Sequence, residues 1–456
     1  MENVLKPALA EQAKVFRALI KDYCQLESVA AQNRMMGETA EWVENLLKDT
    51  GFDTHQLEVD GAPNYVYGEM KGRSDYILLF YNHYDVQPED PVDLWKSPPF
   101  ELTERDGKLF ARGIADNKAE LIARVCAIKA LLATYGELPI TIKWIIEGEE
   151  EIGSPHFDTM TKTFSELFTS DGALWEGGGF AEQGEAYITL GFRGLLYIEL
   201  AIKILKQDAH SSLASFFPSA AWRLVKALSC LRNDEGKVLI PGFYDDVLEP
   251  TEAQKEALHK LVDPDTEDNI KKMYGVKAFI DDASGYELEK KVFEPTANIA
   301  GFFTGYTEEG SKTVLPAQAM AKMDFRLVPD QNPDDILDNL RTYLEEQGFN
   351  DVEIKMNEAA EAVVTPMNNP FVQKVGRICA NFTGMESLIV PLAAPSLSLL
   401  EAFKKNLKIL GLSTVGNPIY YGSGAHAPNE HIRLTDVTKA IEFNAYLLEE
   451  LGKKIP

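Results

Sequence analysis

Residues 140–154 read ITIKWIIEGEEEIGS, an apolar run that leads directly into three adjacent glutamates at positions 149–151. Four apolar side chains alternate with other residues, as in a buried strand: Ile140, Ile142, Trp144 and Ile146. The strand therefore delivers carboxylates at its end. In open α/β sheets ligands bind at that edge, and clustered carboxylates there bind cations or move protons. A solvated loop is the alternative for an isolated acidic run, so the rest of the chain decides.

The length and charge of the chain limit what it can be. A chain of 456 residues exceeds the size at which one core keeps growing, so we expect two domains. It has 71 acidic against 45 basic residues and a formal charge of −26. Binding to nucleic acid or to an anionic membrane depends on a basic surface. The composition therefore argues against both kinds of partner and favours a soluble protein.

The cysteines and the N-terminus indicate a reducing compartment. The four cysteines are scattered without a Cys-x-x-Cys spacing, which argues against a thiolate zinc site and a disulfide framework. The first residues lack the basic start and the apolar core of a signal peptide. No window approaches the roughly 18 apolar residues of a membrane span. We therefore expect a cytoplasmic protein.

Strands that alternate with helices predict an α/β sheet covered on both faces. The strands at 76–81 and 109–113 precede His83 and Asp116, a helical pattern follows at 120–132, and a strand at 172–175 ends before Glu176. After residue 357 the chain returns to helices at 370–382 and 435–451, around a short strand at 418–421. We assign residues 1–193 and 358–456 to this α/β domain.

Residues 194–357 predict a smaller domain inserted into the first. The patterns give a strand at 196–204, a helix at 219–231, strands at 298–303 and 322–327, a helix from 333 and a strand at 352–356. This β-α-β-β-α-β order is the ferredoxin-like split βαβ unit. Within it, residues 233–294 are rich in charge, and we expect a helical, solvent-exposed insertion there.

Five places at strand ends or in loops carry residue types that bind metals. They are His83 with Asp85, Asp116, Glu150 with Glu151, Glu176, and His426. Imidazole and carboxylate without thiolate suit catalytic zinc, and also manganese or cobalt. A single histidine or aspartate in a loop is usually solvated. Their joint placement after predicted strands is therefore the observation that favours a metal site.

Four ordered motifs carry a resemblance to a known family: HYDVQP at 83–88, GIADNK at 113–118, EGEEEIGS at 147–154 and GAHAPNE at 424–430. Together they resemble the M20 metallopeptidases, closest to the carnosinase and cytosolic non-specific dipeptidase branch. The resemblance runs over nearly the whole chain. It implies a zinc-exopeptidase-like α/β catalytic domain and an inserted lid and dimerisation domain.

The resemblance implies two divalent metal ions per chain, zinc first, with manganese or cobalt as alternatives. Asp116 matches the aspartate that bridges the two ions in that family, followed there by a cis peptide. His83 and Glu176 match the further ligands of one ion. Glu151 and His426 match those of the other.

The remaining catalytic roles also follow from the family pattern. Glu150 takes the position of the general base, which accepts a proton from water and passes it to the leaving amine. Asp85 is similar to the carboxylate that orients the imidazole of His83. The three glutamates leave a register alternative. We align Glu150 and Glu151 with the base and the ligand of the family, which leaves Glu149 as the extra residue.

In the smaller domain the resemblance implies contacts with substrate. His210, in Asp208-Ala209-His210-Ser211, matches a histidine that reaches into the site of a neighbouring subunit and polarises the scissile carbonyl, which implies a homodimer. Arg326 matches the arginine that binds the substrate carboxylate. Asn298 and Thr313 lie where the family places polar contacts. For His210 and Arg326, an exposed side chain without a role is the alternative.

One loop departs from the family. Dipeptidases of this branch carry an arginine followed by a Gly-Gly-Ser-Ile-Pro-like loop, but residues 392–397 of this chain read LAAPSL. We therefore expect a dinuclear metal-dependent hydrolase that cleaves amide bonds of dipeptides or short peptides. The altered loop keeps an N-acyl-amino-acid or other non-peptide amidohydrolase open as the alternative.

Overall fold

The chain divides into two compact units in the computed structural model, which describes residues 4–177, 179–181, 184–397, 399–406, 412–415 and 424–453. The first unit is formed by Met1–Leu190, Thr365–Pro391 and Ala402–Pro456, and the second by Gly191–Val364 and Leu392–Glu401. The expected borders, 193/194 and 357/358, lie a few residues away. Residues 392–401 group with the second unit because part of this segment pairs with one of its strands.

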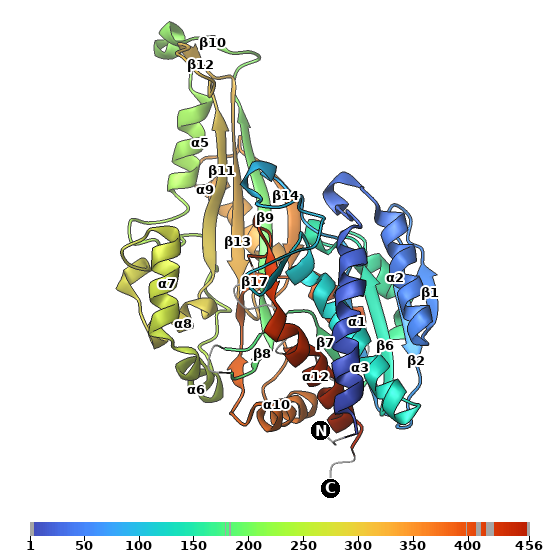
Figure 1. Cartoon of the computed structure of the whole chain (residues 1–456). Helices are drawn as coiled ribbons and strands as arrows, with labels where there is room; N and C mark the ends of the chain where they lie inside the picture. Colours follow the sequence, from blue (N-terminus) through green and yellow to red (C-terminus); the bar gives the residue numbers. More distant parts are fainter. Residues whose placement is uncertain are drawn as a thin grey trace. The chain divides into compact units, whose positions relative to one another are not determined.

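The first unit is built on an eight-stranded mixed sheet with the order β1-β2-β6-β3-β7-β18-β8-β16 (Figure 1). Its strands are β1 (Asp53–Leu57), β2 (Tyr65–Met70), β3 (Ile77–His83), β6 (Thr141–Glu147), β7 (Gly172–Trp175), β8 (Tyr187–Thr189), β16 (Leu388–Val390) and β18 (Leu412–Val415). The four central strands, from β6 to β18, are parallel to one another. A small antiparallel sheet of β4 (Thr103–Arg105), β5 (Lys108–Phe110) and β19 (His431–Arg433) belongs to the same unit.

The register of the central strands determines where polar residues leave the core. All seven residues of β6 are buried, as are six of the seven residues of β3, because β3 lies inside the parallel part of the sheet and is covered on both faces. His83 pairs with Glu147 in this register. The sequence expectation of strands that end in His83 and before the glutamates is therefore confirmed.

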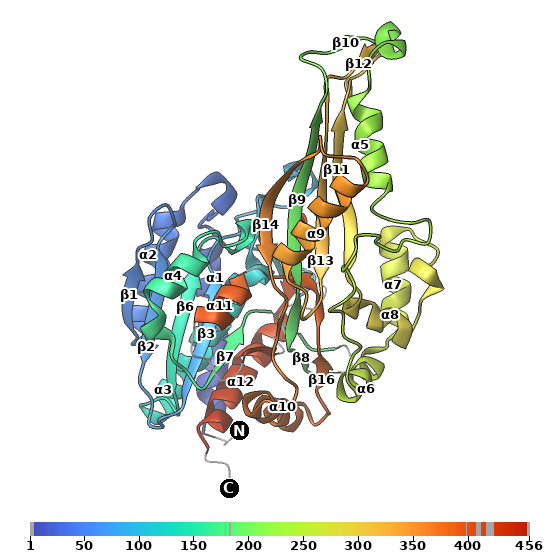
Figure 2. The same cartoon turned by 180° about the vertical axis from the view of Figure 1, so that it is seen from behind.

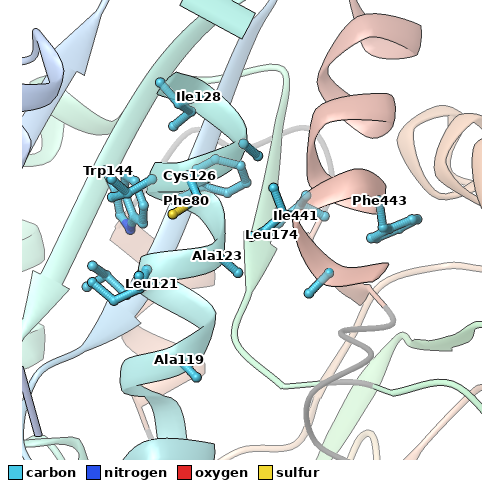
Figure 3. Close-up of a cluster of buried hydrophobic side chains, with 14 of the residues drawn as sticks. Phe80, Ala119, Leu121, Ala123, Cys126, Ile128, Trp144, Leu174, Ile441 and Phe443 are labelled. Carbon is cyan, nitrogen blue, oxygen red and sulfur yellow. The ribbon is translucent and has the colours of Figure 1, made fainter. Parts of the chain in front are cut away.

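Helices fill the space around this sheet. They are α1 (Lys6–Cys24), α2 (Met36–Thr50), α3 (Ala119–Tyr135), α4 (Phe157–Thr163), α10 (Pro370–Thr383), α11 (Leu399–Asn406) and α12 (Leu434–Leu451). Helix α3 is buried almost all round, which requires apolar residues on every side. Figure 3 shows Leu121 near Trp144 of the sheet, while Ile441 and Phe443 extend from α12.

The second unit contains an antiparallel sheet with the core order β11-β13-β9-β14 (Figure 2). Its strands are β9 (Gly191–Lys203), β11 (Thr296–Thr304), β13 (Gln318–Leu327) and β14 (Glu353–Ala360), with β15 (Val363–Val364) and β17 (Ala393–Ser396) on β9, and a separate pair, β10 (Ala209–His210) and β12 (Val314–Leu315). Helices α5 (Ala220–Ser229) and α9 (Pro333–Glu346) pack on this sheet. The elements follow one another in the expected β-α-β-β-α-β order.

The charged segment after α5 is helical, as expected. It contains α6 (Glu252–Leu261), α7 (Pro264–Tyr274) and α8 (Tyr286–Lys290). The strand expected at 418–421 lies outside the described residues. Within the described ranges, no helix is long and apolar enough to cross a membrane.

The core around α3 gives a stability prediction. Leu121 is fully buried, whereas Leu94 is 59% exposed. Replacing Leu121 by alanine should lower the free energy of unfolding by about 2–5 kcal/mol, because it removes buried apolar surface and leaves a cavity. The same substitution at Leu94 should change it by less than about 0.5 kcal/mol. Urea unfolding followed by circular dichroism measures both, and equal shifts would contradict this description of the core.

Candidate metal centre

The carboxyl ends of three neighbouring strands bring the expected metal-binding residues of the first unit together. His83 is the last residue of β3, and Glu176 follows the last residue of β7. Glu150 and Glu151 lie in a helical turn just after β6. Because β3, β6 and β7 are parallel neighbours, their carboxyl ends meet at one edge of the sheet.

Asp116 lies at the middle of this group. Its Oδ1 is 3.2 Å from Nε2 of His83, and its Oδ2 is 3.0 Å from Nε2 of His426. Glu176 Oε2 is 3.3 Å from the same nitrogen of His83, and Glu151 Oε2 is 3.1 Å from the same nitrogen of His426. Each oxygen of one aspartate therefore faces its own histidine and its own glutamate, which divides the residues into two sets with Asp116 in common.

The electrostatics of Asp116 follow from this arrangement. Burial opposes its ionisation, but the hydrogen bonds with His426 and His83 outweigh burial and hold the pKa of Asp116 well below its usual range. The hydrogen bonds with Asp116 and Glu151 raise the pKa of His426 to about 10. In the absence of a cation, the imidazoles thus act as the counter-charges of the carboxylates.

The loop after Asp116 has the backbone geometry that the resemblance implies. The Asp116-Asn117 peptide bond is cis. The side-chain amide of Asn117 donates a hydrogen bond to Oε2 of Glu176. Asn82 in turn donates to Oδ1 of Asn117 at 3.1 Å. Sequence reasoning gave Asn117 no role, yet it holds the carboxylate of Glu176 in place.

Asp85 contacts both sides of the centre. Its Oδ1 is 3.3 Å from Nδ1 of His83, and its main-chain oxygen is 2.9 Å from the same nitrogen. Its carboxylate also accepts hydrogen bonds from the backbone N–H groups of Glu150 and Glu151, at 3.3 and 3.0 Å. Asp85 therefore links the orientation of the imidazole to the position of the glutamate turn.

The three consecutive glutamates face different partners. Glu149 is buried and contacts Nδ1 of His156 at 2.9 Å. Glu150 lies with His83 and Glu176, and Glu151 with His83 and Asp116. Glu149 thus lies outside the group that contains Glu150 and Glu151. This agrees with the alignment in which Glu149 is the extra residue.

Burial is the main influence on the acidity of Glu150. It raises the pKa of Glu150 to about 8, with His83 opposing the rise and the neighbouring carboxylates of Glu151 and Asp116 adding to it. A cation bound nearby would favour the ionised form. Burial thus makes the carboxylate of Glu150 a stronger proton acceptor than a solvated glutamate, which suits a group that accepts and returns a proton.

Arg124 of α3 connects the ends of β3 and β7. It donates to the main-chain oxygens of Tyr81 and Trp175, at 2.7 and 2.9 Å, and to Oδ1 of Asn82 at 2.7 Å. It also pairs with Glu120 one helical turn earlier. No sequence pattern assigned this role, because an arginine inside an apolar helix has no local motif.

Four of the expected residues lie in the second unit. His210 is exposed, with Nδ1 2.8 Å from the hydroxyl of Ser212 and Nε2 3.3 Å from that of Thr313. Asn298 donates to Oδ1 of Asp324 at 2.8 Å, and Oδ2 of Asp324 lies 3.7 Å from Nε of Arg326. The structure thus brings His210 together with Thr313, and connects Asn298 to Arg326 through Asp324.

The altered loop is ordered in the second unit. Leu392 is buried with Leu258 of α6 and Phe293. The hydroxyl of Ser396 donates to the main-chain oxygen of Gly194 at 2.9 Å. β17, which follows Leu392 and ends at Ser396, runs parallel to the start of β9. The apolar residue at position 392 therefore anchors the loop to the inserted helices.

The residues at the first unit's sheet edge fit divalent cations. Two imidazole nitrogens and several carboxylates converge without a thiolate, and this donor set suits zinc, manganese or cobalt. Asp116 offers one oxygen to each set, which is how a carboxylate bridges two metal ions. Burial, with repulsion from neighbouring carboxylates added, raises the pKa of Glu150 and Glu176, and cations between these groups would oppose that rise.

Comparisons with known proteins agree with this chemistry. The chain is 28% identical to the Beta-Ala-His dipeptidase of Rattus norvegicus over 388 residues, which cover 82% of this chain and 77% of the relative. It is 25% identical to a Cys-Gly metallodipeptidase of Schizosaccharomyces pombe over 434 residues, covering 90% and 87%.

Solved structures extend the likeness to the whole fold. The M20 family metallo-carboxypeptidase Sso-CP2 from Sulfolobus solfataricus matches with 34% identity and a TM-score of 0.88, over 99% of this chain and 100% of the other. Human carnosine dipeptidase 1 shares the fold at 23% identity and a TM-score of 0.79, covering 98% and 99%. The model of peptidase family M20/M25/M40 matches residues 79–450. The chain belongs to peptidase family M20/M25/M40.

Proposed function

We propose that this protein is a dinuclear metal-dependent hydrolase that cleaves the peptide bond of dipeptides or short peptides. The position of Asp116 between His83 and His426 carries the proposal. A shared carboxylate flanked by two further ligand sets is an arrangement that serves two cations. The named dipeptidases among the relatives support the substrate class.

Asp116 would be shared by the two metal sites. His83 and Glu176, which lie 3.3 Å apart, would complete one site, and His426 and Glu151, which lie 3.1 Å apart, the other. We propose zinc as the metal, with manganese or cobalt as alternatives, because all three accept imidazole and carboxylate ligands. When bound, the metal ions supply Lewis-acid polarisation of the scissile carbonyl and make water a stronger acid.

Glu150 moves the protons of the reaction in this proposal. It accepts a proton from the attacking water and returns it to the nitrogen of the leaving amine. Asp85 keeps Glu150 in position because it accepts the hydrogen bond from the Glu150 backbone N–H. The same carboxylate faces Nδ1 of His83, so one side chain orients both a ligand and the base.

The second unit supplies recognition in this proposal. Arg326 binds the free carboxylate of the substrate, for which a guanidinium is the most suitable partner. Asn298 and Thr313 add polar contacts. His210 donates a hydrogen bond to the developing oxyanion. The contact of Thr313 with Nε2 of His210 supports a common role for these two residues.

We also propose that the second unit is a lid through which two copies associate. Large apolar side chains on and before α5 are exposed: Phe216 is 76% and Trp222 69% exposed. On the edge strand β11, Ile299 and Phe303 are about half exposed. Exposed apolar side chains of this size are common at protein interfaces. In this proposal, His210 acts at the site of the partner copy.

The substrate class has one specific rival, an N-acyl-amino-acid or other amidohydrolase. Leu392, packed against Leu258 and Phe293, stands in the loop that differs from the dipeptidase pattern. The 34% identity with a metallo-carboxypeptidase instead extends the proposal towards longer peptides.

For the location of the enzyme we propose the cytoplasm, supported by its four free cysteines.

A substrate panel with controlled metal content tests the proposed function. Protein stripped with a chelator should be inactive, and addition of Zn²⁺, Mn²⁺ or Co²⁺ should restore cleavage of dipeptides with a free carboxyl group. Amidated dipeptides should be cleaved poorly, because they lack the charge that Arg326 binds. Longer peptides and N-acyl amino acids complete the panel. Turnover of the acylated compounds alone would reject the peptidase assignment.

The glutamate turn provides a matched pair of variants. Glu150→Gln should lower kcat by about 100- to 10,000-fold, because the amide does not accept a proton from water. Its KM and metal content should stay close to those of the unchanged protein. Glu149→Gln removes the neighbouring carboxylate, which pairs with His156 instead, and should retain activity. Steady-state kinetics on the best dipeptide compare the two, and full activity of Glu150→Gln would contradict the mechanism.

A mixed-dimer experiment tests the role of His210. His210→Ala and Glu150→Gln homodimers should each be nearly inactive. If His210 serves the partner's site, random mixing of subunits should recover about a quarter of the normal activity, because half of the dimers then contain one complete site. Differently tagged subunits refolded together give this mixture, and the mixed dimers purified from it should reach about half of the normal activity, because one of their two sites is complete. Mixed dimers without recovered activity would show that His210 does not act across the dimer.

A further inference from the structure

Glu430 is a buried carboxylate next to the metal centre that has no place in the mechanism above. It lies four residues after His426 and is 1% exposed. Its Oε2 accepts hydrogen bonds from Nη1 of Arg112 at 2.8 Å and from the backbone N–H of Gly113 at 2.9 Å. Its Oε1 accepts from the backbone N–H groups of Ala115 and Asp116, at 2.8 and 3.1 Å. Both oxygens thus accept two hydrogen bonds each.

These four donors belong to one short segment, residues 112–116, which ends at the bridging aspartate. The backbone adds a further contact, from the N–H of Ala111 to the main-chain oxygen of Glu430 at 3.3 Å. The segment therefore surrounds a single carboxylate from a distant part of the chain. Glu430 lies 314 positions after Asp116. Glu430 accepts a hydrogen bond directly from the backbone N–H of Asp116, the residue that both proposed metal sites share.

The same carboxylate belongs to the turn that presents His426. The Ala427 N–H donates to the main-chain oxygen of Gly424 at 3.0 Å, and His426 itself has a φ of +63°. Non-glycine residues rarely adopt this left-handed conformation, so the turn needs support from its surroundings. Glu430, at the end of the turn, connects it firmly to the Asp116 segment.

We propose that Glu430 is a positioning residue of the metal centre, which sets the distance between Asp116 and His426 by binding the backbone of the segment that carries Asp116. The inference rests on the proposed metal sites and deepens them. Residues that hold ligands in place commonly change metal affinity by about 10- to 100-fold when they are replaced. Glu430 touches no substrate or reacting atom, so its effect passes through Asp116.

A simple structural role as the ion-pair partner of Arg112 is the competing explanation. The two explanations differ in which contacts matter. The ion pair needs only Arg112, whose guanidinium also donates to the main-chain oxygen of Pro88 at 3.0 Å. Positioning needs the three backbone donors of residues 113, 115 and 116. Arg112→Lys removes the paired guanidinium and leaves those three donors on Glu430.

Metal binding to the chelator-treated protein tests the proposal without relying on activity. Glu430→Gln removes two acceptor positions, and Glu430→Asp keeps the charge but shortens the reach. Both variants should bind Co²⁺ about 10- to 100-fold more weakly in calorimetric titrations. The visible absorption of bound Co²⁺ should also shift, because the ligands around it move. Arg112→Lys should lose stability to urea and keep its metal affinity.

Asp436→Asn is the matched control for a buried carboxylate in the same part of the chain. Asp436 is 7% exposed and accepts a hydrogen bond from Nε of Arg433 at 2.6 Å. Its replacement should lower stability and leave Co²⁺ affinity unchanged. Unchanged Co²⁺ affinity in both Glu430 variants, an equal loss in Asp436→Asn, or failure of both Glu430 variants to fold would overturn the positioning role in favour of a structural one. If the unchanged protein bound no Co²⁺, the proposed function itself would fail.

Discussion

The contact of one carboxylate with two imidazoles is the constraint on which the first unit depends. Asp116 presents Oδ1 to His83 and Oδ2 to His426, and these three residues come from three distant segments of the chain. Both contacts exist only if the end of β3, the loop before α3 and the turn before β19 meet at one place. The parallel register of the central strands determines the position of the end of β3, because it fixes where this strand leaves the core.

The charges around this contact explain the hydrogen bonds beneath it. A charged group that leaves water loses its hydration, and it is tolerated only where hydrogen bonds or counter-charges replace that hydration. Arg124 meets this condition with main-chain and side-chain oxygens at the ends of β3 and β7. Asp85 meets it with two backbone N–H groups and an imidazole. The same bonds that stabilise the buried charges also restrict the ligands to one geometry.

The sequence was informative where local patterns and motifs decide the structure. The alternation before Glu147 predicted β6, and the quoted motifs contain the residues that converge in the first unit apart from Glu176, which follows a predicted strand. The register of the three glutamates needed coordinates, because neighbouring residues of a turn point in different directions and only contacts distinguish them. Glu149 turns to His156, whereas Glu150 and Glu151 face the histidines of the centre.

Residues that act through the backbone of distant segments escaped prediction. Glu430 stands in a quoted motif, GAHAPNE, but its partners lie in another motif more than 300 residues earlier. No periodicity or spacing expresses such a pairing. The same holds for Asn117, whose amide reaches Glu176 because the turn before α3 lies beside the end of β7. The borders of the second unit show a related effect, since β17 pairs with β9 across some two hundred residues.

In the proposed function, the chemistry and the substrate preference have separate origins in the two units. Among the described residues, His83 and His426, which face Asp116, belong to the first unit, as do the glutamates beside them. Arg326, Asn298 and the 392–397 loop belong to the second unit. Leu392 is held by the apolar contacts of the inserted helices, so a change in that insertion alters the loop without disturbing a metal ligand. In the proposed function, a change of substrate preference therefore leaves the proposed metal-binding residues in place.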